Sequence, residues 1–146
     1  MELSEEKIKG ISSLFVEDQL EVEYLHKSIP VTSIDIEIEC KKQIELEAIV
    51  VYLYGKYESS LLKATYSSET LYWSLYNKLE GTGVSREARV RSDERFIEEE
   101  RCKVEAKQRF SVIKVLHSAI GSRRSMIEQM SNNYRLHKRI DEVDHL

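Results

Sequence analysis

The 146-residue sequence predicts an all-α fold with two long helices and a shorter N-terminal helix, packed in the manner of a coiled coil. Two observations lead to this expectation. The chain has only five glycines and one proline, so it offers few of the tight turns that a small β or Gly-rich α/β fold needs. Apolar residues also recur at helical spacing along two long segments. With 41% hydrophobic residues, the length fits a single helical domain over residues 1–146.

The first 30 residues are expected to form one N-terminal helical segment. Ser4 can cap a helix whose first turn is acidic, and apolar residues follow at helical spacing. Pro30 closes the segment, because a proline disfavours helical backbone in the residue before it.

The next segment is expected to be a long helix over residues 33–80. Between Cys40 and Leu79 there is no proline and only one glycine. Near its start, over residues 33–39, isoleucines alternate with acidic residues, and this period of two is typical of a strand. A lone strand would have no obvious partner, so strand and helix stay open as alternatives here.

Residues 81–91 contain two glycines and three arginines, and they are expected to form a basic linker. A second, basic helix is expected over residues 92–140, with Ser92 as its cap. Helices of about 40 residues would be about 60 Å long, longer than a compact globule of this size needs. We therefore expect the chain to pack against copies of itself. The expected interface residues, at spacings of three, four and seven, are Phe110, Ile113, Ile120, Ile127, Met130 and Tyr134.

The net charge of −4 conceals an uneven distribution along the chain. Residues 1–50 hold five lysines against twelve acidic residues, whereas residues 101–140 hold ten basic residues against two acidic ones. Lys103, Lys107 and Lys114 fall on one helix face. Such a stripe can follow the phosphates of a nucleic acid, or it can pair with the acidic half of the same or a neighbouring subunit.

Aromatic residues recur along the first long helix and allow two interpretations. Aromatic side chains at helical spacing are more often core or interface than platforms for stacking bases. Trp73 and Tyr76 are the members of the set for which the two interpretations are most evenly balanced.

Several classes of protein are not indicated. The sequence has no phosphate-binding glycine motif, no histidine or cysteine at metal-ligand spacing and no evident nucleophile with its base. We therefore expect no enzymatic activity, no cofactor and no metal. The N-terminus lacks the features of a signal peptide, and no apolar stretch is long enough for a membrane span, so we expect a cytoplasmic protein without a membrane partner.

The sequence contains KATY at residues 63–66, LY at 71–72, Gly81 and AIGSR at 119–123. In order and spacing, these four features resemble the UvsY family, the recombination mediators of T4-type bacteriophages. The resemblance covers roughly Asp35 to Tyr134.

The resemblance implies an all-helical subunit that assembles into a ring or bundle of six or seven copies and binds single-stranded DNA. It implies that the protein helps a RecA-like recombinase of the UvsX type to displace the phage single-strand-binding protein, so that the compartment would be the cytoplasm of the infected host. Arg123 falls on the family's arginine, and Lys63 falls on a commonly basic position.

This chain departs from the family near the end of the first long helix. Trp73 and Leu75 stand where relatives place basic residues, and only Lys78 remains nearby. The second helix and the linker arginines are therefore expected to contribute more to DNA contact. The expected DNA-binding residues are Lys63, Lys78, Arg86, Arg89, Arg91, Lys103, Lys107, Lys114, Arg123 and Arg124.

The alternative is a coiled-coil assembly protein without DNA binding. In that case the acidic first half would pair with the basic second half between subunits. It predicts the same oligomer but little free positive surface.

Overall fold

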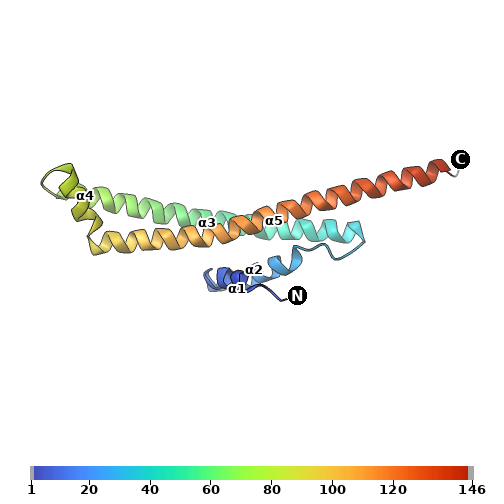
Figure 1. Cartoon of the computed structure of the whole chain (residues 1–146), viewed down its shortest axis with the longest axis horizontal. Helices are drawn as coiled ribbons and strands as arrows, with labels where there is room; N and C mark the ends of the chain where they lie inside the picture. The colour runs from blue at the N-terminus through green and yellow to red at the C-terminus, as the bar shows by residue number, and fades with distance from the viewer. Residues whose placement is uncertain (1, 145–146) are drawn as a thin grey trace. The chain divides into compact units, whose positions relative to one another are not determined.

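The computed structural model describes the backbone of residues 2–144 and the side chains of residues 2–140, and within this part all regular structure is helical (Figure 1). The all-α prediction is therefore confirmed. The helices are α1 (Glu5–Ser12), α2 (Val16–Ser28), α3 (Ile36–Lys78), α4 (Gly83–Arg91) and α5 (Glu94–Asp144).

The N-terminal segment forms two helices and not one. Ser4 caps α1 as expected, with its hydroxyl oxygen accepting a hydrogen bond from the Lys7 amide at 3.4 Å. The hydroxyls of Ser12 and Ser13 then donate to the carbonyls of Lys9 and Gly10 at 2.9 and 2.6 Å. Serines that bond to nearby carbonyls favour a helix end, so the segment breaks here and α2 starts at Val16.

Residues 36–39 are helical, so the strand alternative for residues 33–39 is wrong. Asp35 caps α3, because its carboxylate accepts hydrogen bonds from the amides of Glu37 and Ile38 at 2.9 and 3.4 Å. The cap places Ile36 and Ile38 in the first turn of a helix, so their spacing of two residues does not indicate a strand.

The predicted linker over residues 81–91 is mostly helix, which corrects the expectation. Gly81 has a φ of +120°, a conformation that other residues rarely adopt, and it turns the chain out of α3. Thr82 then accepts a hydrogen bond from the Ser85 amide at 3.4 Å and caps α4. The turn is therefore confined to the residues around the two glycines.

The second long helix begins two residues later than expected. Ser92 ends α4, and its hydroxyl donates to the Arg89 carbonyl at 3.0 Å. Asp93 takes the cap position of α5, since its carboxylate accepts from the Arg95 amide at 2.9 Å. The expected cap at Ser92 is therefore wrong, and Asp93 replaces it.

The residues group into two compact units. The terminal unit contains the residues up to Leu53 and those from Ile113 onward, and the central unit contains Tyr54–Val112. Both long helices contribute to both units, and a single domain stays a prediction.

In the terminal unit, α3 and α5 pack side by side and antiparallel (Figure 1). The buried positions of α3 are Glu39, Gln43, Leu46, Val50 and Leu53. The buried positions of α5 are Ile113, Leu116, Ile120, Arg123 and Ile127. Steps of three and four on both helices are the spacing of a coiled-coil seam, which agrees with the coiled-coil-like packing that the sequence predicts.

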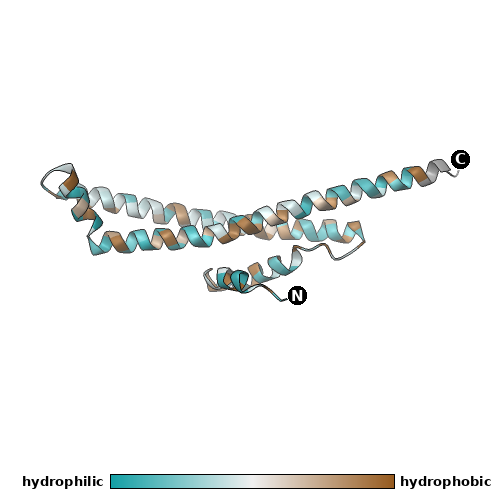
Figure 2. Ribbon diagram, in the orientation of Figure 1, coloured by the Kyte–Doolittle hydropathy of each residue, from teal (hydrophilic) through white to brown (hydrophobic). Residues whose placement is uncertain are grey.

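The buried apolar side chains of the central unit come from three helices. Tyr57 and Leu75 of α3, Val90 of α4 and Ala106 of α5 are buried. The rings of Tyr54 and Phe110 meet edge to face at 5.0 Å. Figure 2 shows that apolar and polar residues alternate along these helices, as expected for helices with one buried stripe.

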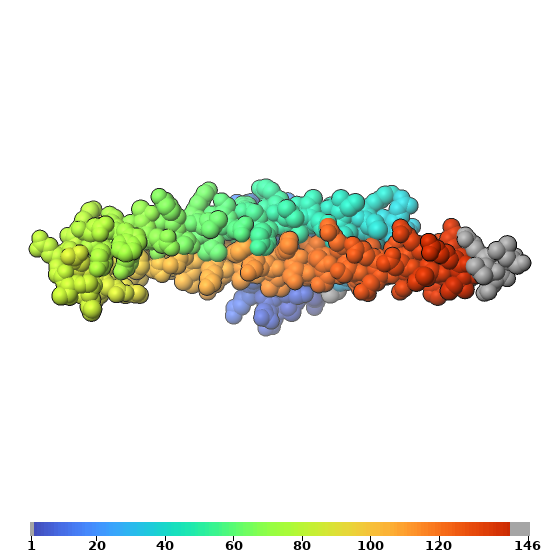
Figure 3. Space-filling model, turned by 90° about the horizontal axis from the view of Figure 1, so that it is seen from above, coloured from blue at the N-terminus to red at the C-terminus, as the bar shows by residue number. Residues whose placement is uncertain are grey.

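The end of α5 continues beyond the start of α3 (Figures 1 and 3). Of the expected interface residues, Ile113, Ile120 and Ile127 are buried within the chain itself, and Phe110 is half-buried. Met130 is half-buried, and Tyr134 is 64% exposed. The chain's own fold therefore covers most of the expected interface and leaves its C-terminal members open.

Candidate nucleic-acid interface

The ten expected DNA-binding residues divide between the two units. Lys114, Arg123 and Arg124 belong to the terminal unit. The central unit holds the other seven, namely Lys63, Lys78, Arg86, Arg89, Arg91, Lys103 and Lys107.

Arg123 is buried, with 2% of its surface exposed. Its guanidinium pairs with the carboxylate of Glu39, which is 1% exposed, and donates to the Gln43 side-chain oxygen at 2.8 Å. A guanidinium enclosed in this way is not presented to a phosphate. The structure therefore removes Arg123 from the DNA-binding set and makes it a core residue.

The other two expected DNA-binding residues of the terminal unit lie on the surface of α5. Arg124 donates to Glu47 through Nε at 2.6 Å and also through Nη2. The Arg124 hydrogen bond holds the pKa of Glu47 below its ordinary value, so the pair stays ionised at neutral pH. Lys114 is exposed, but it also interacts with another group of the chain, so it is not a free cation.

The central unit contains a cationic pocket of about 370 Å³ at the α3–α4–α5 turn. Lys78 from α3, Arg89 from α4 and Arg95 from α5 line it, together with the single carboxylate of Asp93. Arg95 pairs with Asp93 at 3.0 Å, whereas no carboxylate among the described residues pairs with Lys78 or Arg89. The pocket therefore carries two uncompensated cations.

The other expected DNA-binding residues of the central unit differ in whether a carboxylate pairs with them. Arg91 pairs with Glu87 at 2.8 Å, and Lys103 pairs with Glu100 at 2.7 Å. Within the described residues Lys63 and Lys107 are exposed and form no ion pair. These two lysines add free positive charge to the faces of α3 and α5.

An aromatic cluster lies in the same unit as the cationic pocket. The rings of Tyr72 and Tyr76 are stacked at 5.9 Å with 17° between their planes. Trp73 meets both edge to face, at 5.2 and 5.7 Å, and Phe96 of α5 lies 5.7 Å from Tyr72. Arg86 packs over the Tyr76 ring at 5.5 Å and donates to the Gly81 carbonyl at 3.0 Å. The three α3 rings are thus fixed by one another.

A second pocket of about 230 Å³ opens beside these rings. The aromatic part of its lining comes from Tyr72, Trp73 and Phe96. The hydrogen bond from Lys103, followed by that from Ser68, keeps the pKa of the Glu100 carboxyl below its ordinary value. The lining residues are Ser68, Glu69, Tyr72, Trp73, Arg91, Phe96, Glu100 and Lys103.

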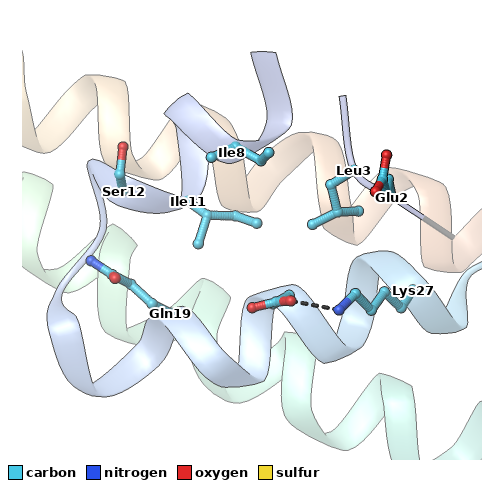
Figure 4. Close-up of a pocket in the computed structure, with 8 residues that line it drawn as sticks. Glu2, Leu3, Ile8, Ile11, Ser12, Gln19 and Lys27 are labelled. Carbon is cyan, nitrogen blue, oxygen red and sulfur yellow. Dashed lines mark hydrogen bonds and ion pairs between the residues drawn. The ribbon is translucent and has the colours of Figure 1, made fainter. Parts of the chain in front are cut away.

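A pocket of about 520 Å³ lies between the first residues, α1 and α2 (Figure 4). Leu3, Ile8 and Ile11 supply apolar side chains, and the Glu23–Lys27 ion pair at 2.5 Å stands beside them. None of the expected DNA-binding residues lines this pocket.

Among the described residues, no group of three or more acidic, histidine or cysteine side chains is placed to bind a metal. The helices described here include none with an apolar stretch of membrane-spanning length.

Sequence reasoning missed Arg95, which completes the cationic pocket. The signal for it is its place two residues after the Asp93 cap, whose carboxylate accepts hydrogen bonds from its amide and its side chain. Trp73, for which the sequence left core and stacking platform as alternatives, is 57% exposed and lies off the buried heptad of α3. No protein-family model matches the chain, and comparisons with curated proteins and with solved structures give no match.

Proposed function

We propose that this chain binds single-stranded DNA through its central unit and acts without catalysis. The observation that supports the proposal best is the cationic pocket, where Lys78 and Arg89 lie together without a carboxylate partner among the described residues. Lysine and arginine side chains that are not neutralised attract phosphates and release condensed counterions. The free lysines Lys63 and Lys107 extend this positive charge along both long helices.

We further propose the biological role that the UvsY resemblance implies. A homo-oligomer would gather several copies of the central unit, so that weak contacts to one strand act together. Such an assembly would help a RecA-like recombinase to replace the single-strand-binding protein on DNA. The exposed end of α5, including Tyr134, supports self-association, because it leaves apolar side chains uncovered in the single chain.

A fluorescence anisotropy titration with labelled oligo(dT) tests the DNA-binding proposal. We expect binding at low salt that weakens as salt increases, and tighter binding to the single strand than to a duplex of the same length. The variant Lys78→Glu, Arg89→Glu should weaken binding at least tenfold, because it reverses the charge of the pocket.

The matched control is Lys9→Glu, Lys27→Glu. It changes the net charge by the same amount, but both substitutions lie in α1 and α2, which belong to the terminal unit. Equal loss of binding in both variants would contradict a localised site and would indicate only a response to net charge.

The second candidate function is assembly without DNA binding. Tyr134, Leu136 and Ile140 are exposed on the end of α5, and exposed apolar groups of this kind are typical of helix-pairing surfaces. This candidate predicts an oligomer that binds no oligo(dT) at low salt, so the same titration separates the two.

A further inference from the structure

We propose that the pocket beside Trp73 holds one unpaired base of the bound strand, stacked on the Trp73 indole. This inference rests on the proposed DNA binding and adds to it a site for a base, distinct from the cationic pocket that would hold phosphate. It is carried by the exposure of Trp73, the fixed geometry of the rings around it and the charge balance of the pocket.

Trp73 is exposed but not loose. More than half of its surface, 57%, is open to solvent, although an indole buries more apolar area than any other side chain when it packs. Tyr72 and Tyr76 hold it edge to face from the same helix. A ring that is already ordered loses little conformational entropy when a ligand stacks on it, so its affinity for a flat aromatic ligand is higher.

The charges of the pocket favour a base over a phosphate. Arg91 and Lys103 contribute two positive charges, and Glu69 and Glu100 contribute two negative ones. A pocket with balanced charge and aromatic walls offers no net attraction to an anion, whereas a neutral base can stack on the rings and hydrogen-bond to the polar groups. The Ser68 hydroxyl and the Lys103 ammonium group both donate to Glu100. The remaining oxygens of the pocket's carboxylates and the remaining hydrogens of the Lys103 ammonium group are available partners for base edges.

The cationic pocket lies at the same turn of the central unit. Lys78 follows Trp73 by five residues on α3, about 7.5 Å along the helix axis at 1.5 Å per residue. Arg86, packed over Tyr76, comes from α4 as Arg89 does. Both pockets are lined by residues of α3, α4 and α5, so the central unit offers phosphate contacts and base stacking on the same three helices, the combination that non-specific single-strand binding uses.

The chain has a single tryptophan, so tryptophan emission, excited at a wavelength that the eight tyrosines do not absorb, reports this site alone. Titration of the full chain with oligo(dT) should quench Trp73 emission with the same midpoint as anisotropy of labelled DNA. An abasic oligonucleotide of equal length, which keeps the phosphates, should bind in a salt-dependent manner without this quenching.

Substitutions give the affinity side of the test. Trp73→Ala should weaken oligo(dT) binding roughly 5- to 150-fold, the range of one stacked base, and Trp73→Phe should recover most of it. Tyr66→Ala is the matched control, because Tyr66 is an exposed aromatic residue of α3 in the same unit that does not line the pocket. It should change affinity less than twofold.

The outcomes distinguish failure of the base site from failure of the proposed DNA binding. DNA binding without Trp73 quenching, and with Trp73→Ala equal to Tyr66→Ala, would overturn the base site and leave the proposed DNA binding standing. Equal quenching by the abasic strand would also overturn it. Absence of any binding to oligo(dT) at low salt would remove both.

Discussion

Arg123 of α5 and Glu39 of α3 form an ion pair that is almost completely buried between the two helices of the terminal unit. The second oxygen of Glu39 accepts hydrogen bonds from the amides of Ser33 and Thr32, at 2.9 and 3.4 Å. The pair therefore fixes α5 against α3 and also holds the loop that leads from α2 into α3. Buried polar groups that specify one register are a known use of such pairs in coiled coils.

Arg123→Ala should destabilise the chain by about 3–5 kcal/mol, because it leaves the Glu39 carboxylate buried without its cation. Urea unfolding followed by circular dichroism measures this change. The exposed i,i+4 pair Lys41–Glu37 provides the control, and Lys41→Ala should cost less than about 1 kcal/mol.

The double variant Arg123→Met, Glu39→Leu should recover most of the lost stability, since it removes both buried charges together. A double variant as unstable as Arg123→Ala would contradict this cause, and would point instead to the Ser33 and Thr32 amides, which lose their acceptor when Glu39 is replaced.

The surface pair between Glu47 and Arg124 should make stability depend on pH. The Arg124 hydrogen bond lowers the pKa of Glu47 in the folded chain. A depressed carboxyl pKa stabilises the fold above the ordinary glutamate value of 4.5, and this contribution is lost as pH falls through the folded value. The difference in melting temperature between wild type and Arg124→Gln should therefore be largest near neutral pH and should shrink as the pH falls below 4.5 and through the folded value. A constant difference across this range would contradict it.

Two glycines should respond oppositely to alanine. Gly81 has a φ of +120°, so Gly81→Ala should cost about 1–3 kcal/mol through backbone strain. Gly55 lies inside α3, and a Cβ there would meet nothing within 4 Å. Gly55→Ala should therefore stabilise the chain by about 0.5–1 kcal/mol. Thermal unfolding of both variants checks the pair, and equal signs would contradict the assigned turn.

The open end of α5 should control self-association. Tyr134→Ser removes an exposed aromatic side chain and should reduce the mass measured by light scattering while leaving helix content unchanged. Ile120→Ser, within the chain's own core, should instead lower stability. If both variants kept the wild-type mass, the end of α5 would not be the interface.

The sequence predicts the helices well because their cause is local. Apolar steps of three and four identify α3 and α5, and Ser4 identifies the start of α1. The strand alternative and the linker fail for a related reason. Asp35 caps α3 although the residues after it alternate as in a strand. Thr82 caps α4 although the residues after it are polar and basic as in a linker.

The site is harder to predict, because the exposure of a charge depends on a distant residue. Arg123 and Lys78 are both basic residues on helices, and nothing in their immediate neighbours separates them. The distinction comes from α3, where the heptad that places Leu46 in the core also places Glu39 opposite Arg123. Continuing that heptad toward the N-terminus would have revealed a buried acid in need of a cation.

The salt dependence of binding to oligo(dT) tests the central claim most directly. Each phosphate contact to a single strand should contribute about −0.7 to the slope of log K against log salt concentration. Lys78→Gln and Arg89→Gln should each reduce the wild-type slope by about that amount. A wild-type slope near zero, or a slope that neither substitution changes, would show that the cationic pocket at the α3–α4–α5 turn does not bind DNA.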